Sequence, residues 1–152
     1  MRLAALVLLA LAARASADEP RFPAGEATFK ARCAVCHRAS GAGTPGLAPP
    51  LTADAPGFLK SVEGRRQLAL TVLFGMYGDI EVAGRHYNFK MPSFATESDE
   101  ALAEALNHAL FDLAHADASL APLTAAEIAS HRAEGLDGSA VRAHRAEVLA
   151  TP

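Results

Sequence analysis

The sequence predicts an all-α domain that folds around one large apolar group. Several segments repeat apolar residues with the 3.6-residue period of an amphipathic helix. The chain contains no Trp, seven Phe and two Tyr, which are few large side chains for the core of a domain this size. A stretch rich in Gly and Pro runs over 40–64, and so long a loop is uncommon in a compact domain unless it wraps around something.

The first residues are typical of a secretory signal peptide. Met1 and Arg2 precede eleven apolar positions, and Ala15-Ser16-Ala17 then matches a signal-peptidase site. Eleven apolar residues are too few for a membrane-spanning helix, which needs about twenty. Cleavage after residue 17 leaves 18–152, with 12 basic and 17 acidic residues and so a charge of −5. This acidic balance disfavours nucleic acid and anionic membranes as partners, and export implies a periplasmic location.

The first half of the mature chain contains two predicted helices and a hairpin. The first helix runs over 21–38 and ends in a pair of cysteines. The second is predicted over 65–76 and ends near a glycine. Alternating apolar residues at 80–82 and 85–87 flank the dipeptide Ala83-Gly84, which predicts a small hairpin.

The second half is also helical. Ser98 or Thr96 can cap a third helix, whose apolar stripe is the clearest periodic signal in the chain and consists of Leu102, Leu106, Ala109, Leu110 and Leu113. Thr124 and Glu127 form a capping-box pattern at the start of another short helix. A last, Ala-rich helix is predicted over 139–149.

The chemistry of the chain centres on the run Cys33-Ala34-Val35-Cys36-His37. In this C-x-x-C-H pattern one helical turn brings both sulfurs to the same porphyrin edge, where they bond the vinyl groups, and the next residue reaches the iron. A disulfide across so small a loop would stabilise little, a zinc site needs four ligands, and a thioredoxin-like pair needs a βαβ setting. The pattern therefore predicts one covalent haem c, attached through Cys33 and Cys36.

The chain resembles a class I cytochrome c, of the bacterial monohaem subgroup that serves periplasmic dehydrogenases or oxidases. The resemblance covers about 22–115 and implies a helical fold wrapped around the haem. Gly25 and Phe29 are similar to the family's N-terminal helix, which packs against its C-terminal helix. Where that last helix usually carries an aromatic residue facing the Phe29 position, this sequence offers only His108 or Leu110.

The resemblance also implies haem contacts. A proline-rich segment is similar to the family's proline loop, so the Pro49 carbonyl is expected to accept the ring N–H of His37, and Leu51 to pack on the haem. Residues 78–92 are similar to the segment on the far side of the haem. Within it, Tyr87 either bonds a haem propionate or is a plain packed tyrosine.

The sixth iron ligand must come from that far side. We predict Met91, because it lies in an irregular segment and Pro92 prevents a helix just beyond it. Met76 is interpreted as a core residue of the second helix, and His86 as a solvated residue of the hairpin. Solvated or capping roles are expected for the remaining histidines, which are His108, His115, His131 and His144.

With His37 and Met91 on the iron, substrate cannot reach the metal, so the sequence predicts an electron carrier of a respiratory chain rather than an enzyme. We expect a cytochrome domain at 18–120 and a C-terminal extension at 121–152. A dedicated partner or subunit of a dehydrogenase could use this extension to dock, whereas a shuttle diffusing freely to a terminal oxidase would not need it. A haem sensor or peroxidase is less favoured. Residues 137–152 are expected to pack weakly.

Three charged residues complete the candidates. Arg65 and Arg66 either face the haem propionates or are solvated at a helix start. Lys90 precedes the predicted ligand and is a candidate for partner docking at the haem edge.

Overall fold

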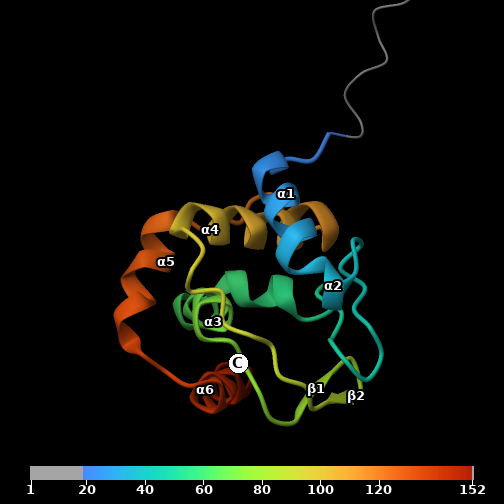
Figure 1. Cartoon of the computed structure of the whole chain (residues 1–152), viewed down its shortest axis with the longest axis vertical. Helices are drawn as coiled ribbons and strands as arrows, with labels where there is room; N and C mark the ends of the chain where they lie inside the picture. The colour runs from blue at the N-terminus through green and yellow to red at the C-terminus, as the bar shows by residue number, and fades with distance from the viewer. Residues whose placement is uncertain (1–18, 152) are drawn as a thin grey trace, which may run out of the picture.

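The computed structural model describes residues 19–151, so the predicted signal peptide at 1–17 lies outside the described residues. The described chain consists of helices and one small hairpin (Figure 1). A cavity lies among these elements. In chain order the elements are α1 (Pro23–Arg32), α2 (Ala34–His37), the 3₁₀ helix η1 (Ala55–Lys60), α3 (Val62–Phe74), β1 (Ile80–Val82), β2 (Arg85–Tyr87), α4 (Asp99–Asn107), the π-helical η2 (His108–Leu113), α5 (Ala125–His131), the 3₁₀ helix η3 (Arg132–Glu134) and α6 (Gly138–Ala150). The dominance of helix confirms the predicted all-α fold. Within 19–151 no helix is long and apolar enough to cross a membrane.

The crossing of α1 over α4 depends on a glycine. A Cβ atom at Gly25 would lie 2.0 Å from the carbonyl oxygen of Glu104, so only glycine lets the two backbones come this close. Phe29, one turn later, is buried, and its ring centroid lies 5.5 Å from that of His108. Of the two residues that the sequence offered for this contact, His108 therefore makes it. Its Nδ1 atom lies 2.9 Å from Asp112, whose carboxylate also accepts the N–H of Phe22 at the start of α1.

The long loop is shorter than predicted, because η1 and the first turn of α3 occupy its end. Ser61 caps α3, since its hydroxyl oxygen accepts the Gly64 N–H at 3.0 Å. The backbone of Phe58 packs against Gly64, where a Cβ would lie 2.2 Å from the Phe58 carbonyl oxygen. This contact holds η1 on α3 and buries Phe58 and Leu59. The predicted start of the helix at residue 65 is wrong by three residues. Its end was predicted at residue 76, near Gly75 or Gly78, and the helix ends two residues earlier, at Phe74, with Gly75 as its C-cap.

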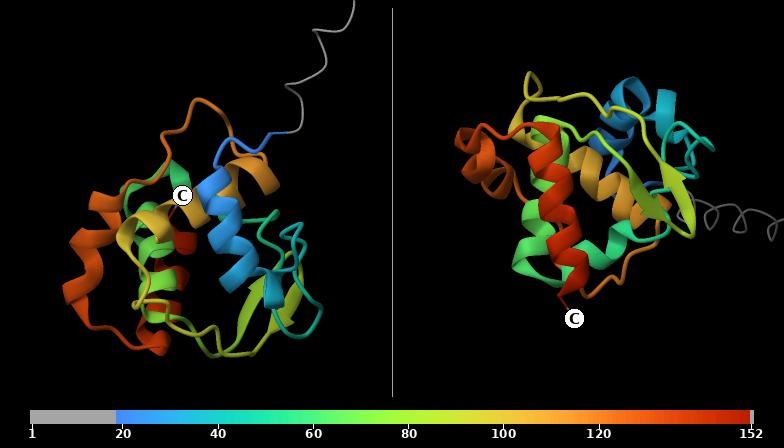
Figure 2. Two further views of the ribbon diagram at one scale, coloured as in Figure 1. Left: turned by 45° about the horizontal axis from the view of Figure 1, so that its top comes forward. Right: turned by 90° about the horizontal axis from the view of Figure 1, so that it is seen from below.

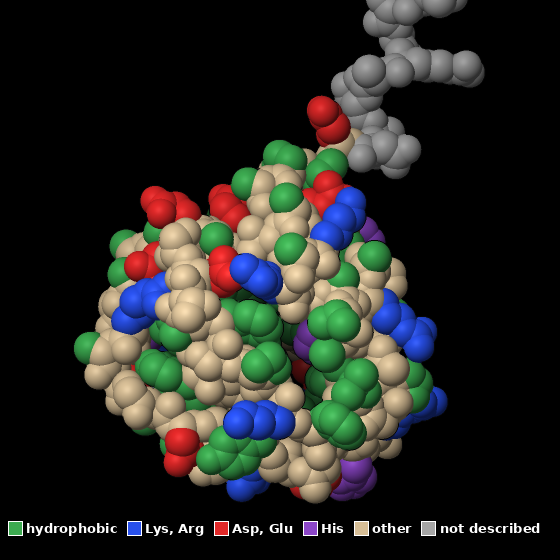
Figure 3. All heavy atoms as spheres, viewed as in Figure 1, with side chains coloured by type: hydrophobic (Ala, Val, Ile, Leu, Met, Phe, Trp, Pro, Cys, Tyr) green, Lys and Arg blue, Asp and Glu red, His purple; other side chains and the backbone are tan. Residues whose placement is uncertain are grey.

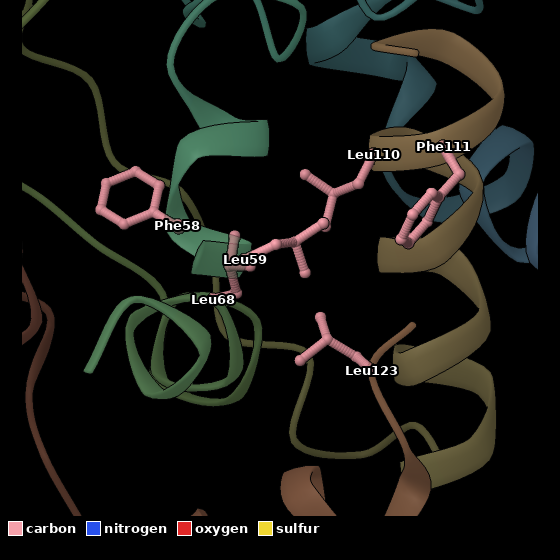
Figure 4. Packing of buried hydrophobic residues seen from close by; sticks show 6 residues of the cluster. All are labelled: Phe58, Leu59, Leu68, Leu110, Phe111 and Leu123. Atoms are coloured by element: carbon pink, nitrogen blue, oxygen red, sulfur yellow. The ribbon is translucent and has the colours of Figure 1, made fainter. Parts of the chain in front are cut away.

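Two apolar clusters on α3 form the core. The first joins α3 to η1, η2 and the segment after η2, and its residues are Phe58, Leu59, Leu68, Leu110, Phe111 and Leu123 (Figure 4). The second joins α3 to α4 and α5, and its residues are Ala69, Val72, Leu73, Leu102, Ala103 and Ile128. Because both clusters lie on α3, this helix is the scaffold to which the cavity walls are fixed.

The predicted hairpin is confirmed. β1 and β2 pair antiparallel, with Ile80 opposite Tyr87 and Val82 opposite Arg85. Ala83 and Gly84 both have positive φ, at 50° and 72°, as a two-residue turn of type I′ requires.

The C-terminal segment packs on the same scaffold. The capping box of Thr124 and Glu127 is formed, as predicted, and Ile128 of α5 is fully buried. α6 lies along α3 (Figures 1 and 2) and buries Val141 completely. The expectation of weak packing for 137–152 is therefore wrong, because α3 offers the partner surface that an Ala-rich helix lacks in isolation. The division into folding units at residue 120 stays a prediction.

Candidate functional site

The cavity is apolar, and residues of α1, α2, η1, α3, β1, α4, η2 and α6 line it. Its lining includes Phe29 of α1, Leu68 and Val72 of α3, Ile80 of β1 and Leu110 of η2. Figure 3 shows hydrophobic side chains gathered around the hollow on one face of the molecule. Cys33, Cys36, His37, Leu51 and Met91 also line this cavity, so the fold brings most of the predicted site residues together.

The cysteine motif is positioned by a break between two helices. α1 ends at Arg32, and α2 is a single turn in which the His37 N–H donates to the Cys33 carbonyl at 2.9 Å. The predicted continuous helix over 21–38 is thus interrupted at Cys33. Both cysteines are free thiols rather than a disulfide. Burial raises the pKa of the Cys33 thiol to about 11, so it stays neutral, unlike the thiolate of a redox pair.

The proline loop orients the imidazole of His37. Its Nδ1 lies 3.0 Å from the carbonyl oxygen of Pro49, the contact that the family resemblance implies. Burial lowers the pKa of His37 and the Pro49 carbonyl opposes that shift, so the neutral ring is favoured. With Nδ1 donating to this carbonyl, Nε2 is the nitrogen available to a metal. Two hydrogen bonds hold the loop itself. The Thr44 hydroxyl donates to the Cys36 carbonyl, and the Gly43 N–H donates to the His37 carbonyl.

Met91 is held against the end of α3. Met91 and Met76 form an antiparallel bridge in which each N–H donates to the carbonyl of the other, at 2.8 and 3.1 Å. Gly75 makes room for this approach, since a Cβ there would lie 2.4 Å from the Met91 carbonyl oxygen. Ser93 and Phe94 then bond the carbonyls of Leu73 and Val72. The thioether-bearing segment is therefore fixed by hydrogen bonds at Met91 itself and at the residues just after it.

Met76 departs from its interpretation as a core residue within a helix. α3 ends at Phe74, so Met76 lies beyond the helix, is only half-buried and lines the same cavity as Met91. Gly75 with φ of 72° ends the helix before the apolar stripe does.

Three of the predicted haem contacts lie elsewhere. Tyr87 is buried at 6% exposure in β2 and is not among the residues that line the cavity, which fits the plain packed tyrosine. Arg65 makes a bidentate pair with Glu127, at 2.6 and 3.0 Å, and Arg66 makes one with Glu134. Both arginines thus fasten α3 to the C-terminal segment, and they neither line the cavity nor stand free in solvent as expected.

Sequence reasoning missed Arg145. This α6 residue is 9% exposed and lines the cavity, where it donates to the Glu81 carbonyl at 3.2 Å and lies 3.8 Å from the Asp54 carboxylate. Burial lowers the pKa of its guanidinium, and the nearby Asp54 carboxylate only partly offsets this loss of hydration. The spacing of Val141 and Arg145, four residues apart on one helical face, was the available signal.

Two free thiols one helical turn apart, an oriented imidazole and a thioether in one apolar cavity define a protein that holds a covalent haem. The donor set is the one that a covalent haem requires, and all of its side chains line the same cavity. The model of the cytochrome c family matches residues 22–142, and the chain belongs to that family. It therefore carries one haem c, with iron, bound through Cys33 and Cys36, and it is an electron carrier rather than an enzyme.

Two curated relatives are similar to most of the chain. Both are named cytochrome c-552, one from Thermus thermophilus and the other from a designated strain of the same species. Each is 41% identical over 123 residues, which is 78% of this chain. The match covers 92% of the first relative and 82% of the second.

Proposed function

We propose that the protein is a periplasmic carrier that accepts single electrons from a dehydrogenase and passes them on within a respiratory chain. The observation that carries the proposal is the enclosed donor set of His37 and Met91 in one apolar cavity. A bound haem supplies reversible one-electron exchange between ferric and ferrous iron. His37 and Met91 would both bind the iron and so would keep substrates from the metal, which would leave electron transfer as its chemistry.

The side chains have separate tasks in this proposal. His37 is the proximal ligand, held in one tautomer by Pro49. Met91 supplies a thioether, which together with the apolar surroundings favours ferrous over ferric iron. Leu51 packs on one side of the haem, and Arg145 offers a buried positive charge to a haem carboxylate, a contact that would complete its partial hydrogen bonding.

Docking is proposed at the apolar rim of the cavity. Val35 and Phe89 line the cavity and yet are 82% and 62% exposed, so they surround its mouth. Lys90 lies beside Phe89 in the same rim, with its ammonium 5.8 Å from the Tyr77 ring centroid. A small, largely apolar surface suits the brief encounters of electron-transfer partners, which bury little area and separate quickly.

The packing of the C-terminal segment favours a diffusing carrier over a fixed subunit. The case for a subunit rested on a tail that needs an external surface, and α6 instead covers α3 of its own chain. Val141 is fully buried in that contact. A shuttle that serves the dehydrogenase transiently is therefore the better-supported form of the proposal, with a terminal oxidase as its acceptor.

The test is electron delivery by a purified dehydrogenase, followed as haem reduction in stopped flow. Phe89→Glu should slow reduction at least several-fold, which is more than the accompanying fall in midpoint potential from the added negative charge accounts for. Val62→Glu is the matched control, because Val62 is 79% exposed on α3 and is not among the cavity-lining residues. Equal rates for both variants would contradict docking at the rim, and co-purification of the wild-type protein in a stable complex would favour the subunit.

A further inference from the structure

A line of polar side chains connects the wall of the haem cavity to the surface through α6. Gln67 and Thr71 lie one turn apart on α3, line the cavity and are its only polar lining residues from that helix. Behind them, His144 of α6 places Nδ1 at 2.6 Å from Gln67 Oε1. Its Nε2 lies 3.1 Å from the carboxylate of Glu63, which is exposed to solvent.

The hydrogen bonds of Thr71 determine which way the Gln67 amide points. The Thr71 hydroxyl donates to the main-chain carbonyl of Gln67 at 2.8 Å, so its free lone pair accepts from Gln67 Nε2 at 3.0 Å. Gln67 therefore presents its oxygen to His144. Because Gln67 is only 2% exposed, water cannot replace these hydrogen bonds, and the amide keeps this orientation.

Both ring nitrogens of His144 consequently face acceptors. Nδ1 must donate to the amide oxygen of Gln67, and Nε2 faces a carboxylate of Glu63, which has no proton to give when ionised. With the Gln67 oxygen directed at His144, only the imidazolium satisfies both contacts. The hydrogen bond from His144 lowers the pKa of Glu63, which favours the ionised carboxylate beside His144.

We propose that His144 is a proton-linked positioning residue, which holds Gln67 at the haem wall and couples the redox state of the haem to a proton. When one electron arrives from the redox partner, a fraction of a proton is taken up from solvent at His144 Nε2, and oxidation releases it. A positive charge one helix layer from the haem favours the ferrous state, so the midpoint potential should fall as His144 loses its proton.

The charged side chains that α3 presents to His144 are Glu63 and Arg66, and its neighbours on α6 include Arg142 and Glu147. Glu63 of α3 bonds it directly, and Arg66 of α3 bonds the same Glu63 oxygen at 3.4 Å. The helix neighbour Arg145 is directed to Asp54 and the cavity. Arg66 is also paired with Glu134, so the positive charge of a protonated His144 is balanced chiefly by the Glu63 carboxylate.

The test is the midpoint potential of the holoprotein between pH 5 and 8, the range in which imidazoles titrate. The wild-type potential should fall through one step, and His144→Gln should remove that step. His86→Gln is the matched control and should keep it, because His86 is 70% exposed and pairs with Asp79 on the outer face of the hairpin. Glu63→Gln should move the step to lower pH, because the imidazolium loses its carboxylate.

Proton NMR gives a second measurement that needs no variant. The ring C–H resonances of His144 should titrate at higher pH in the ferrous than in the ferric protein, since coupling between electron and proton is reciprocal. The side-chain amide protons of Gln67 should shift with the same midpoint. A pH step that survives His144→Gln, or one His144 midpoint for both redox states, would overturn the proposal. Neither measurement involves a redox partner, so the result is independent of the proposed donor and acceptor.

Discussion

Gly25→Ala should destabilise the protein even though alanine is the better helix former. Gly25 lies in the first turn of α1, where the replacement alone would favour the helix by at most roughly 0.8 to 1 kcal/mol. Against this, the new Cβ would lie 2.0 Å from the Glu104 carbonyl oxygen, whereas ordinary contact begins near 3.4 Å, so the helices must separate by about 1.4 Å. The atom in the way belongs to backbone, which cannot swing aside as a side chain could.

The magnitude follows from what that separation disrupts. Overpacking a core costs about 1 to 3 kcal/mol, and a backbone clash belongs at the upper end of that range. The same movement loosens the contact of Phe29 with His108. Subtracting the gain in helix propensity leaves a net loss of about 2 kcal/mol in the free energy of unfolding.

The assay is guanidinium denaturation of the ferric holoprotein, monitored by circular dichroism and by haem absorbance. Gly57→Ala is the matched control, because a Cβ at Gly57 meets nothing within 4 Å and the residue does not have positive φ. That variant should stay within about 0.5 kcal/mol of the wild type. Gly25→Ala as stable as the wild type, or more stable, would refute the close crossing as the reason for glycine here.

Three further predictions concern the ligand, an ion pair and the tail. Met91→Leu should abolish the sulfur-to-iron charge-transfer band in the visible spectrum, whereas Met76→Leu should retain it; the opposite pattern would move the ligand to Met76. The hydrogen bond from Arg65 lowers the pKa of Glu127 from 4.5 to about 2, so the carboxylate stabilises the fold above pH 4.5 and that contribution fades as pH falls to 2. Glu127→Gln should thus cost about 1 kcal/mol at pH 7 in urea denaturation, after discounting for solvent screening, and nothing near pH 2. Deleting 137–152 should lower stability by at least the ~1.5 to 3 kcal/mol expected for one buried valine and should also shift the haem potential; an unchanged potential would show that α6 is no part of the cavity wall.

Local signals in the sequence were sufficient for several parts of the fold. The capping box of Thr124 and Glu127, the Ala83-Gly84 turn and the spacing of Cys33, Cys36 and His37 each encode their geometry within a few residues. In such cases the neighbours in sequence are also the physical partners, so a pattern is enough. The haem motif is the strongest example, because its chemistry requires no more than one helical turn.

Contacts between distant segments could not be predicted in the same way. Arg65 at the start of a helix has the same local sequence whether it is solvated, bonds a propionate or bonds Glu127, and only tertiary packing selects the last. The end of α3 was equally hidden, because the apolar stripe continues through Met76 while Gly75 stops the helix. Phe29 needed a partner across the crossing, and the structure shows that a histidine braced by Asp112 can provide it.

The C-terminal segment shows why composition alone misled. An Ala-rich helix has a weak intrinsic apolar face, which argued for weak packing, yet α6 places its larger side chains at one surface. Val141 is fully buried, His144 is within hydrogen-bond distance of Gln67, and Arg145 lines the cavity. These three side chains lie within two turns of one helix. The segment that the sequence left available for a partner is therefore committed to the walls of the haem cavity, so its presence no longer requires a permanent complex, and partner docking is better sought at Val35 and Phe89.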